Sequence, residues 1–230
     1  NLNDLQDAML NFLENHDEQR IASGFFSGSG MCAQPAMIVA ATLTKAPVMI
    51  YAGQEFGELG MDHEGFSGMD GRTTIFDYWS VPSIANWAND GKFDGKKLTP
   101  EQRELRDFYK KLLHVTLDQK AITQGLMYDL EYAQDPIHFN PHEHFVYVRK
   151  YQDEVLLFVL NFDDKCANMR IRIPQEAFDF LNWTPKQHYN YIDLLQEEDK
   201  GTALFSPDDD FHVTIPAWKG KIFKLTLNHK

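Results

Sequence analysis

Cysteine is scarce in this sequence. Its only two cysteines, Cys32 and Cys166, lie far apart and lack the CxxC spacing of metal and redox motifs, so neither a disulfide framework nor a zinc knuckle is predicted. Long apolar runs are also missing, because the longest, at 36–43 and 155–160, are far shorter than the roughly 20 residues of a membrane-spanning helix. No signal segment follows Asn1, so we expect a mature product, an engineered piece or a fragment.

Positive charge is scarce as well. The 22 Lys and Arg residues face 34 Asp and Glu residues, which gives a formal net charge of −12, and no basic run or basic helical face stands out. This balance disfavours nucleic acids and anionic membranes as partners and fits a neutral or polar substrate. The 230 residues are 43% hydrophobic and can bury a sizeable core, in one large domain or two small ones. The cellular compartment stays open.

The beginning of the chain allows two interpretations. Apolar residues recur at helical spacing over 4–14, which predicts a helix. The alternative is a short helix ending near Asp7, followed by a strand over "AMLNFLE", and the sequence after it favours this split.

A strand, a helix and a second strand then follow one another. Residues 34–46 predict a helix with Pro35 in its first turn, where the missing N–H costs nothing. The unbroken apolar run "PVMIYAG", closed by Gly53, is typical of a parallel strand that is covered on both faces. The three segments make a βαβ unit whose functional loops lie at the carboxyl ends of its strands.

Residues 57–98 are rich in Gly, Asp and aromatics, and a loop of this length is usually functional or mobile. Thr99, Pro100 and Gln102 then form the capping box of a helix that ends before Gly125.

Beyond Gly125 the apolar period changes to two. Seven short β-rich runs follow, with Gln152 and Asp153 at a hairpin tip and one helical turn in "PQEAFDFLN". They predict an antiparallel sandwich or barrel. The expected fold class is therefore α/β followed by all-β, with a βα portion over 1–120 and a β domain over 121–230.

Four polar side chains follow the two predicted parallel strands. His16 and Asp17 come where the first strand should end, and Gln54 and Glu55 come where the second should end, so they should converge on one rim. Taken alone, "NHD" is more typical of an Asp helix cap beside a hydrogen-bonded histidine.

The two motifs together resemble a known family. "FLENHD" at 12–17, followed by "APVMIYAGQEFG" at 46–57, resembles the ends of the seventh and eighth barrel strands of the α-amylase family of glycoside hydrolases. The resemblance implies the last two βα units of a TIM-type (β/α)8 barrel, followed by a C-terminal antiparallel β-sandwich. It is specific for the first 57 residues and architectural beyond them.

The resemblance also implies roles for individual residues. Asp17 matches the family's third acidic residue, which binds sugar hydroxyls and stabilises an oxocarbenium-like transition state. His16 and Asn15 would bind the same sugar, since an imidazole can donate to a hydroxyl in a way that a carboxylate cannot. Arg72 and Trp79 in the following loop would also bind substrate.

Gln54 and Glu55 are implied to be structural residues near the site, and Arg72 is expected to pair with Glu55 or Asp70, or to form a plain loop ion pair. Tyr78, Phe66 and Trp87 are weaker candidates than Trp79 for a sugar-stacking platform.

A retaining glycosidase needs a nucleophile and a general acid about 5–5.5 Å apart. The family takes them from its fourth and fifth strands, which would precede Asn1, so neither role is assigned here and this chain alone is expected to be inactive. The intact protein is expected to act on α-linked glucans or maltooligosaccharides, with no cofactor and no metal. Neither the histidines of "HFNPHEH" (His138, His142 and His144) nor Asp208–Asp210 match a metal motif; solvated loop histidines and a turn explain them.

Two other functions remain open: a non-catalytic carbohydrate-binding or assembly module, and a transglycosylase or disaccharide isomerase of the same family. An incomplete barrel would also leave Met9, Phe12, Val48 and Ile50 without neighbours, which predicts self-association through that edge or dependence on the β domain for stability.

Overall fold

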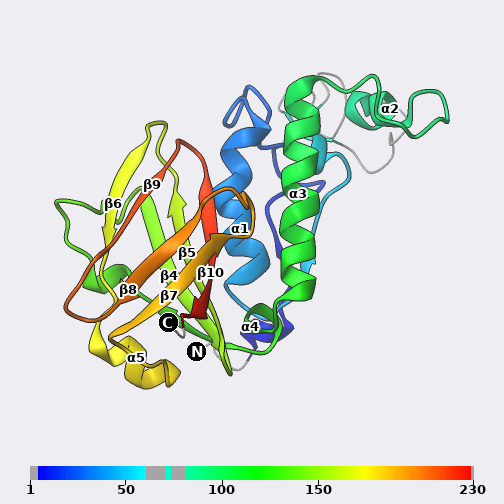
Figure 1. Ribbon diagram of the computed structural model, residues 1–230. Helices are drawn as coiled ribbons and strands as arrows, with labels where there is room; N and C mark the ends of the chain where they lie inside the picture. Colours follow the sequence, from blue (N-terminus) through cyan, green and yellow to red (C-terminus); the bar gives the residue numbers. More distant parts are fainter. Residues whose placement is uncertain (1–4, 61–70, 74–80, 229–230) are drawn as a thin grey trace. The chain divides into compact units, whose positions relative to one another are not determined.

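The computed structural model describes residues 5–60, 71–73 and 81–228. The chain divides into two compact units (Figure 1). Unit 1 comprises Asn1–Ala41 and Ala46–Leu113, and unit 2 comprises Thr42–Lys45 and His114–Lys230. Within the described ranges, no helix combines the length and the apolar character that crossing a bilayer requires.

The described residues of unit 1 form helices, long loops and one two-stranded sheet. Its elements, counting two helices whose last residues fall in unit 2, are η1 (Gln6–Ala8), β1 (Asn11–Phe12), η2 (Gly30–Ala33), α1 (Gln34–Thr42), β2 (Val48–Met49), η3 (Gln54–Phe56), α2 (Pro82–Ala88) and α3 (Pro100–Asp118). Strands β1 and β2 pair in parallel, with Asn11 opposite Val48. The split of the first segment into a short helix and a strand is confirmed, and so is the βαβ order.

The capping box of α3 is also confirmed. Gln102 N donates to Thr99 Oγ1 at 3.2 Å, and Thr99 N donates to Gln102 Oε1 at 2.9 Å. Two of the free N–H groups at the helix start are thereby satisfied. Leu105, Tyr109 and Leu112 on the apolar face of this helix are buried.

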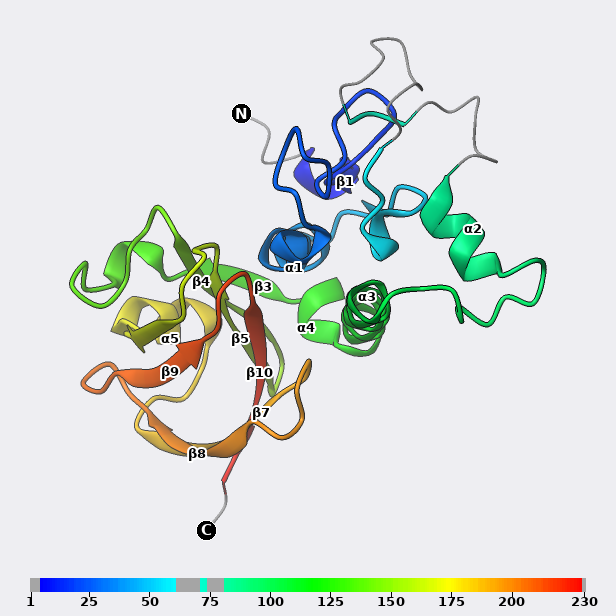
Figure 2. The ribbon, with the colours of Figure 1, turned by 90° about the horizontal axis from the view of Figure 1, so that it is seen from above.

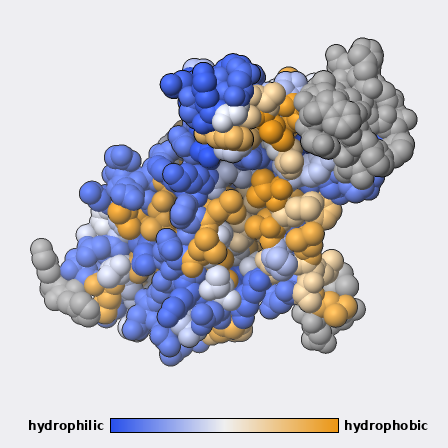
Figure 3. Space-filling view, turned by 90° about the vertical axis from the view of Figure 1, so that its right-hand side faces the viewer, coloured by the Kyte–Doolittle hydropathy of each residue, from blue (hydrophilic) through white to orange (hydrophobic). Residues whose placement is uncertain are grey.

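The prediction that β2 is covered on both faces is wrong for the described residues. Val48 and Met49 are only half-buried, because within these residues the parallel sheet contains two strands. Phe12 of β1 is 42% exposed, and Met9 and Leu10 just before the strand are 47% and 50% exposed. The view in Figure 3 shows exposed apolar side chains, in orange, among hydrophilic ones.

Unit 2 contains two antiparallel sheets. Six strands follow the order β3-β4-β5-β10-β7-β8, and β6 pairs with β9. The elements are α4 (Lys120–Thr123), β3 (Leu126–Asp129), η5 (Glu131–Ala133), β4 (His144–Tyr151), β5 (Glu154–Asn161), β6 (Ala167–Ile171), α5 (Gln175–Leu181), β7 (Gln187–Asp193), β8 (Lys200–Phe205), β9 (Phe211–Ile215) and β10 (Gly220–Leu227). Figure 2 shows β9 across from β7 and β8 of the curved larger sheet.

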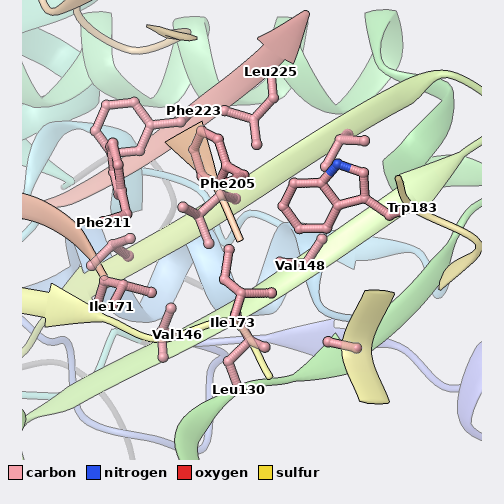
Figure 4. Packing of buried hydrophobic residues seen from close by; sticks show 14 of the residues in the cluster. Leu130, Val146, Val148, Ile171, Ile173, Trp183, Phe205, Phe211, Phe223 and Leu225 are labelled. Carbon is pink, nitrogen blue, oxygen red and sulfur yellow. The ribbon is translucent and has the colours of Figure 1, made fainter. Parts of the chain in front are cut away.

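One hydrophobic core fills the space between the two sheets. Val148 of β4, Ile171 of β6, Phe211 of β9 and Phe223 of β10 all belong to it (Figure 4). All seven predicted runs are strands, and the predicted helical turn is α5. Strand β8 was not predicted, because Lys200–Phe205 follows an acidic segment and contains Gly201.

A buried arginine anchors the connecting segments of unit 2. Arg149, 1% exposed on β4, donates from Nε to Ala121 O at 2.8 Å and from the second amino group to Gly125 O at 3.0 Å. Its other amino group donates to Thr42 O and Leu43 O at 3.1 and 2.6 Å. Each of the three guanidinium nitrogens of Arg149 thus donates to a backbone carbonyl oxygen.

Candidate active site

The turn after β1 presents the central candidate residues. His16 and Asp17 are exposed, and His16 Nε2 lies 3.4 Å from Asp17 Oδ2. Asn15 shapes this turn, because its Oδ1 accepts from Asp17 N at 2.8 Å and from Glu18 N at 2.9 Å. The Asn15 amide oxygen therefore holds the backbone that carries the acidic group.

A buried ion pair closes the same turn. Arg20 is 1% exposed, and its Nη1 lies 2.9 Å from Glu14 Oε2. The two residues stand three positions before and three positions after Asp17. Glu14 Oε1 also accepts from Ile21 N at 2.8 Å. Burial raises the pKa of Glu14, and the hydrogen bond and charge of Arg20 oppose that rise.

Arg20 links the turn after β1 to the segments after β2. Its Nη2 donates to Ala52 O at 2.8 Å, and its Nε donates to Thr73 Oγ1 at 3.0 Å. The guanidinium group also lies 4.3 Å from the centroid of the Tyr51 ring. Because the Arg20 guanidinium has this many partners, it holds in place the backbone from which the exposed His16–Asp17 turn projects.

The turn after β2 contains buried residues. Gly53 adopts φ 90°, which favours glycine, and Gln54 begins η3 directly after it. Gln54 is 2% exposed; its Nε2 donates to Tyr109 OH at 2.9 Å, and its Oε1 accepts from Tyr51 N at 3.2 Å. These contacts hold the Gln54 side chain in the interior, and its structural role near the site stays a prediction.

Glu55 is half-buried beside Gln54. Its Oε2 is buried and has no hydrogen-bond partner within the described residues. Burial is the main cause that raises its pKa, and backbone hydrogen bonds and the charges of Arg106 and Arg20 oppose this. A neutral carboxyl is thereby favoured more than at an exposed glutamate.

Sequence reasoning missed the buried acid Glu58. Its Oε2 accepts from Ser83 N at 3.1 Å and forms a short contact with Ser83 Oγ, and Glu58 N donates to Gly53 O at 3.1 Å. This links the turn after β2 to the start of α2. It missed Glu14 and Arg20 as well, and the available signal was the pair of opposite charges that bracket "NHD".

Other candidates in unit 1 are placed as follows. Arg72 is half-buried and precedes Thr73, which bonds Arg20; its predicted pairing stays a prediction. Trp79 lies outside the described residues, as do Tyr78, Phe66 and Asp70. The ring of Trp87 packs against Phe56 at 6.0 Å and Phe93 at 5.5 Å, so it supports this loop.

The histidine cluster lies at the start of β4. His144 Nδ1 accepts from Asn140 N at 3.0 Å, and burial lowers its pKa, so it is not the solvated loop residue that was expected. No group of three or more His, Cys, Asp or Glu residues in the described chain could hold a metal ion. Asp208 and Asp210 form ion pairs with Lys186 at 2.9 Å and Arg172 at 3.1 Å in the predicted turn.

No protein-family model matches the sequence. Among solved structures, an α-amylase from Geobacillus thermoleovorans in complex with acarbose matches with a TM-score of 0.62 and 17% identity, over 96% of this chain and 39% of that one. A maltogenic α-amylase, AmyB, from Thermotoga neapolitana gives 0.61 and 17%, over 99% and 45%. AmyP in complex with maltose gives 0.62 and 16%, over 96% and 41%.

The chain has the fold of the C-terminal part of an α-amylase. The resemblance predicted from the motifs at 12–17 and 46–57 is therefore confirmed at the level of fold. The α-amylase-like chain spans 39–45% of the length of these structures. At these identities the likeness establishes the fold, and the activity has to be argued from the residues.

Proposed function

We propose that this chain is the C-terminal portion of a retaining glycoside hydrolase that acts on α-linked glucans. In this proposal residues 1–120 form the last two βα units of a (β/α)8 barrel, and residues 121–230 form a β-sandwich domain. The observation that carries it is the exposed His16–Asp17 pair, held at the end of β1 by the buried Glu14–Arg20 clamp. The fold likeness to α-amylases supports the same assignment.

Asp17 is proposed to bind ring hydroxyls and to stabilise the positive charge that develops at the sugar. An exposed carboxylate on a firmly held turn suits this task, because its attraction for the sugar ring grows as the ring gains oxocarbenium character. His16, 3.4 Å away, would donate to a hydroxyl of the same ring, and Asn15 would hold the turn and contact the sugar. Arg72 and Trp79 are proposed further substrate contacts.

The nucleophile and the general acid are assigned to no residue of this chain, so we expect the 230 residues alone to be inactive. Gln54 and Glu55 are proposed to support the site. The proteins of similar fold were solved with acarbose and maltose, which suggests maltooligosaccharides as first substrates.

The test compares the 230-residue chain with the chain extended upstream, on a maltooligosaccharide, with the product anomers followed by NMR. The proposal is supported if the extended protein releases products with retained anomeric configuration and if Asp17→Asn lowers its turnover rate by more than about a thousandfold. Asp208→Asn, an exposed aspartate in unit 2, serves as the matched control. Turnover by the short chain would overturn the assignment, and transfer or isomerisation products would favour the transglycosylase alternative.

A further inference from the structure

Three aromatic rings from three elements of unit 2 meet beside an edge strand. Tyr128 lies on β3, at the edge of the six-stranded sheet, Tyr132 lies in η5 and Phe180 lies in α5. The centroid of the Tyr128 ring is 6.4 Å from that of Tyr132 and 5.4 Å from that of Phe180. Tyr128 is therefore the middle ring of the three, and we call these three side chains the aromatic platform.

The two outer rings of the platform are exposed. Tyr132 is 66% exposed and Phe180 is 56% exposed, whereas Tyr128 is half-buried and packs against the core of unit 2. Exposed apolar residues that are scattered singly are normal, but rings gathered into one exposed cluster are typical of a binding surface. Neither outer ring belongs to the core, so core packing does not explain why both are aromatic.

The platform is formed before any ligand binds. Helix α5 packs against β3, and the hydroxyl oxygens of Tyr128 and Tyr132 share a hydrogen bond of 2.8 Å. Gln134, just after η5, donates from Nε2 to Leu130 O at 2.6 Å and to Arg172 O at 2.9 Å, which holds the segment that carries Tyr132. A ligand therefore has little side-chain order to impose on the platform.

The polar groups beside the rings include both donors and acceptors. The hydrogen bond with Tyr128 is the main cause that raises the pKa of Tyr132 to about 12, and the charges of Glu176 and Asp129 act in the same direction. One tyrosine hydroxyl donates to the other, so the second hydroxyl hydrogen is left to donate to a ligand. The exposed carboxylates of Glu176 and Asp129 supply acceptors.

This set of groups selects among classes of ligand. Carboxylates beside the rings disfavour phosphates and other anions. A cationic ligand would use the rings and the acceptors but not the tyrosine donor. A sugar chain uses all three, because its rings present apolar C–H faces and its hydroxyls both donate and accept.

We propose that the aromatic platform binds a neutral glucan chain, at a site of unit 2 that shares no residue with the His16–Asp17 turn. Sugar rings pack their C–H faces on Tyr132 and Phe180, and Glu176 accepts from sugar hydroxyls. The choice of an α-linked glucan rests on the proposed function.

The experiment titrates maltoheptaose into the isotope-labelled 230-residue chain and follows the backbone amides of β3, η5 and α5 by NMR. These amides should shift in the parent and equally in Asp17→Asn. Tyr132→Ala and Phe180→Ala, both at exposed positions, should each raise the dissociation constant about fivefold to tenfold. Leu117→Ala removes an apolar side chain that is 79% exposed outside the platform, and it should leave the dissociation constant unchanged.

Tyr132→Phe separates stacking from hydrogen bonding, because it keeps the ring and removes the hydroxyl. It should raise the dissociation constant by less than Tyr132→Ala does. A rise as large as that of Tyr132→Ala would overturn the stacking contact.

Amides of the platform that stay fixed at the highest soluble concentration of maltoheptaose would overturn the proposal. A response to a lysine oligopeptide in place of maltoheptaose would overturn it in favour of a cationic partner. Shifts that depend on protein concentration without ligand, and that Phe180→Ala abolishes, would overturn it in favour of a second copy of the chain.

The outcome also separates the platform from the proposed hydrolase function. Maltoheptaose shifts that are lost in Asp17→Asn but kept in Tyr132→Ala would overturn the platform while supporting the site at Asp17. Shifts with the opposite pattern would support the platform even if the chain extended upstream failed to turn over maltooligosaccharides.

Discussion

The two units bury different kinds of side chain. Unit 2 is built on a contiguous apolar core between two sheets, whereas unit 1 buries Glu14, Arg20, Gln54 and Glu58 around a parallel sheet of two strands. Each unit also buries one arginine. Arg149 in unit 2 donates to backbone carbonyls, while Arg20 in unit 1 is neutralised by a carboxylate beside an exposed acidic turn. Contiguous apolar burial is therefore characteristic of unit 2, and buried polar contacts around the candidate site are characteristic of unit 1.

The largest expected effect comes from breaking the clamp of unit 1. Arg20→Met leaves Glu14 buried without its partner and removes the donors to Ala52 O and Thr73 Oγ1. We expect a loss of about 3–5 kcal/mol in the free energy of unfolding of unit 1. Hydrogen exchange, read peptide by peptide, should rise in unit 1 and stay unchanged over β4 and β5.

Two further variants sharpen this test. Glu14→Gln combined with Arg20→Met should recover part of the loss, because no buried charge then lacks its partner and Ile21 N keeps an acceptor. Arg172→Ala breaks the half-exposed pair with Asp210 and should change stability by at most about 1 kcal/mol. Equal losses in Arg20→Met and Arg172→Ala would contradict the clamp.

The matching variant in unit 2 removes apolar volume. Leu157 on β5 is 0% exposed within the core, so Leu157→Ala should cost about 2–5 kcal/mol by loss of burial and by the cavity it leaves. Urea unfolding followed by the tryptophan signal of unit 2 measures it. Phe12→Ala on the half-exposed β1 is the control in unit 1 and should cost far less. A comparable cost at both positions would mean that β1 has an apolar covering.

A pH-dependent effect is expected at Asp193 at the end of β7. Its Oδ1 accepts from Leu195 N and Ile222 N, and burial raises its pKa to about 6. Between about pH 4 and 6 the Asp193 carboxyl is protonated in the folded state and ionised in the unfolded state. The free energy of unfolding that this group contributes therefore falls as the pH rises from about 4 to about 6.

Asp193→Asn should remove this dependence. The variant keeps an oxygen acceptor but no charge, so at pH 7–8 we expect it to be more stable than the parent by about 1–3 kcal/mol. The difference should shrink toward zero at pH 4. Urea midpoints at pH 4, 6 and 8 measure it, with the exposed Asp208→Asn as control. A gain that does not vary with pH would show that ionisation of Asp193 is not its cause.

The contrast between the units also explains what sequence could predict. Alternating residues and the reciprocal cap at Thr99 are local signals, so they predicted every strand of unit 2 except β8 and the start of α3 correctly. The partners of Arg20 lie at 14, 52 and 73, and no periodicity connects these positions. Motif similarity located the exposed turn at Asp17 but not the buried groups that hold it.

The smallest effect is expected at the start of α3. Thr99→Ala removes the Oγ1 acceptor of Gln102 N and should cost about 1 kcal/mol. Lys110→Ala, an exposed position within the same helix, should stay within about 0.5 kcal/mol of the parent. Because the cap is local, faster hydrogen exchange should be confined to the first turn of α3. If exchange instead rises throughout unit 1, the cap supports the whole unit, and the clamp at Arg20 is not its main source of order.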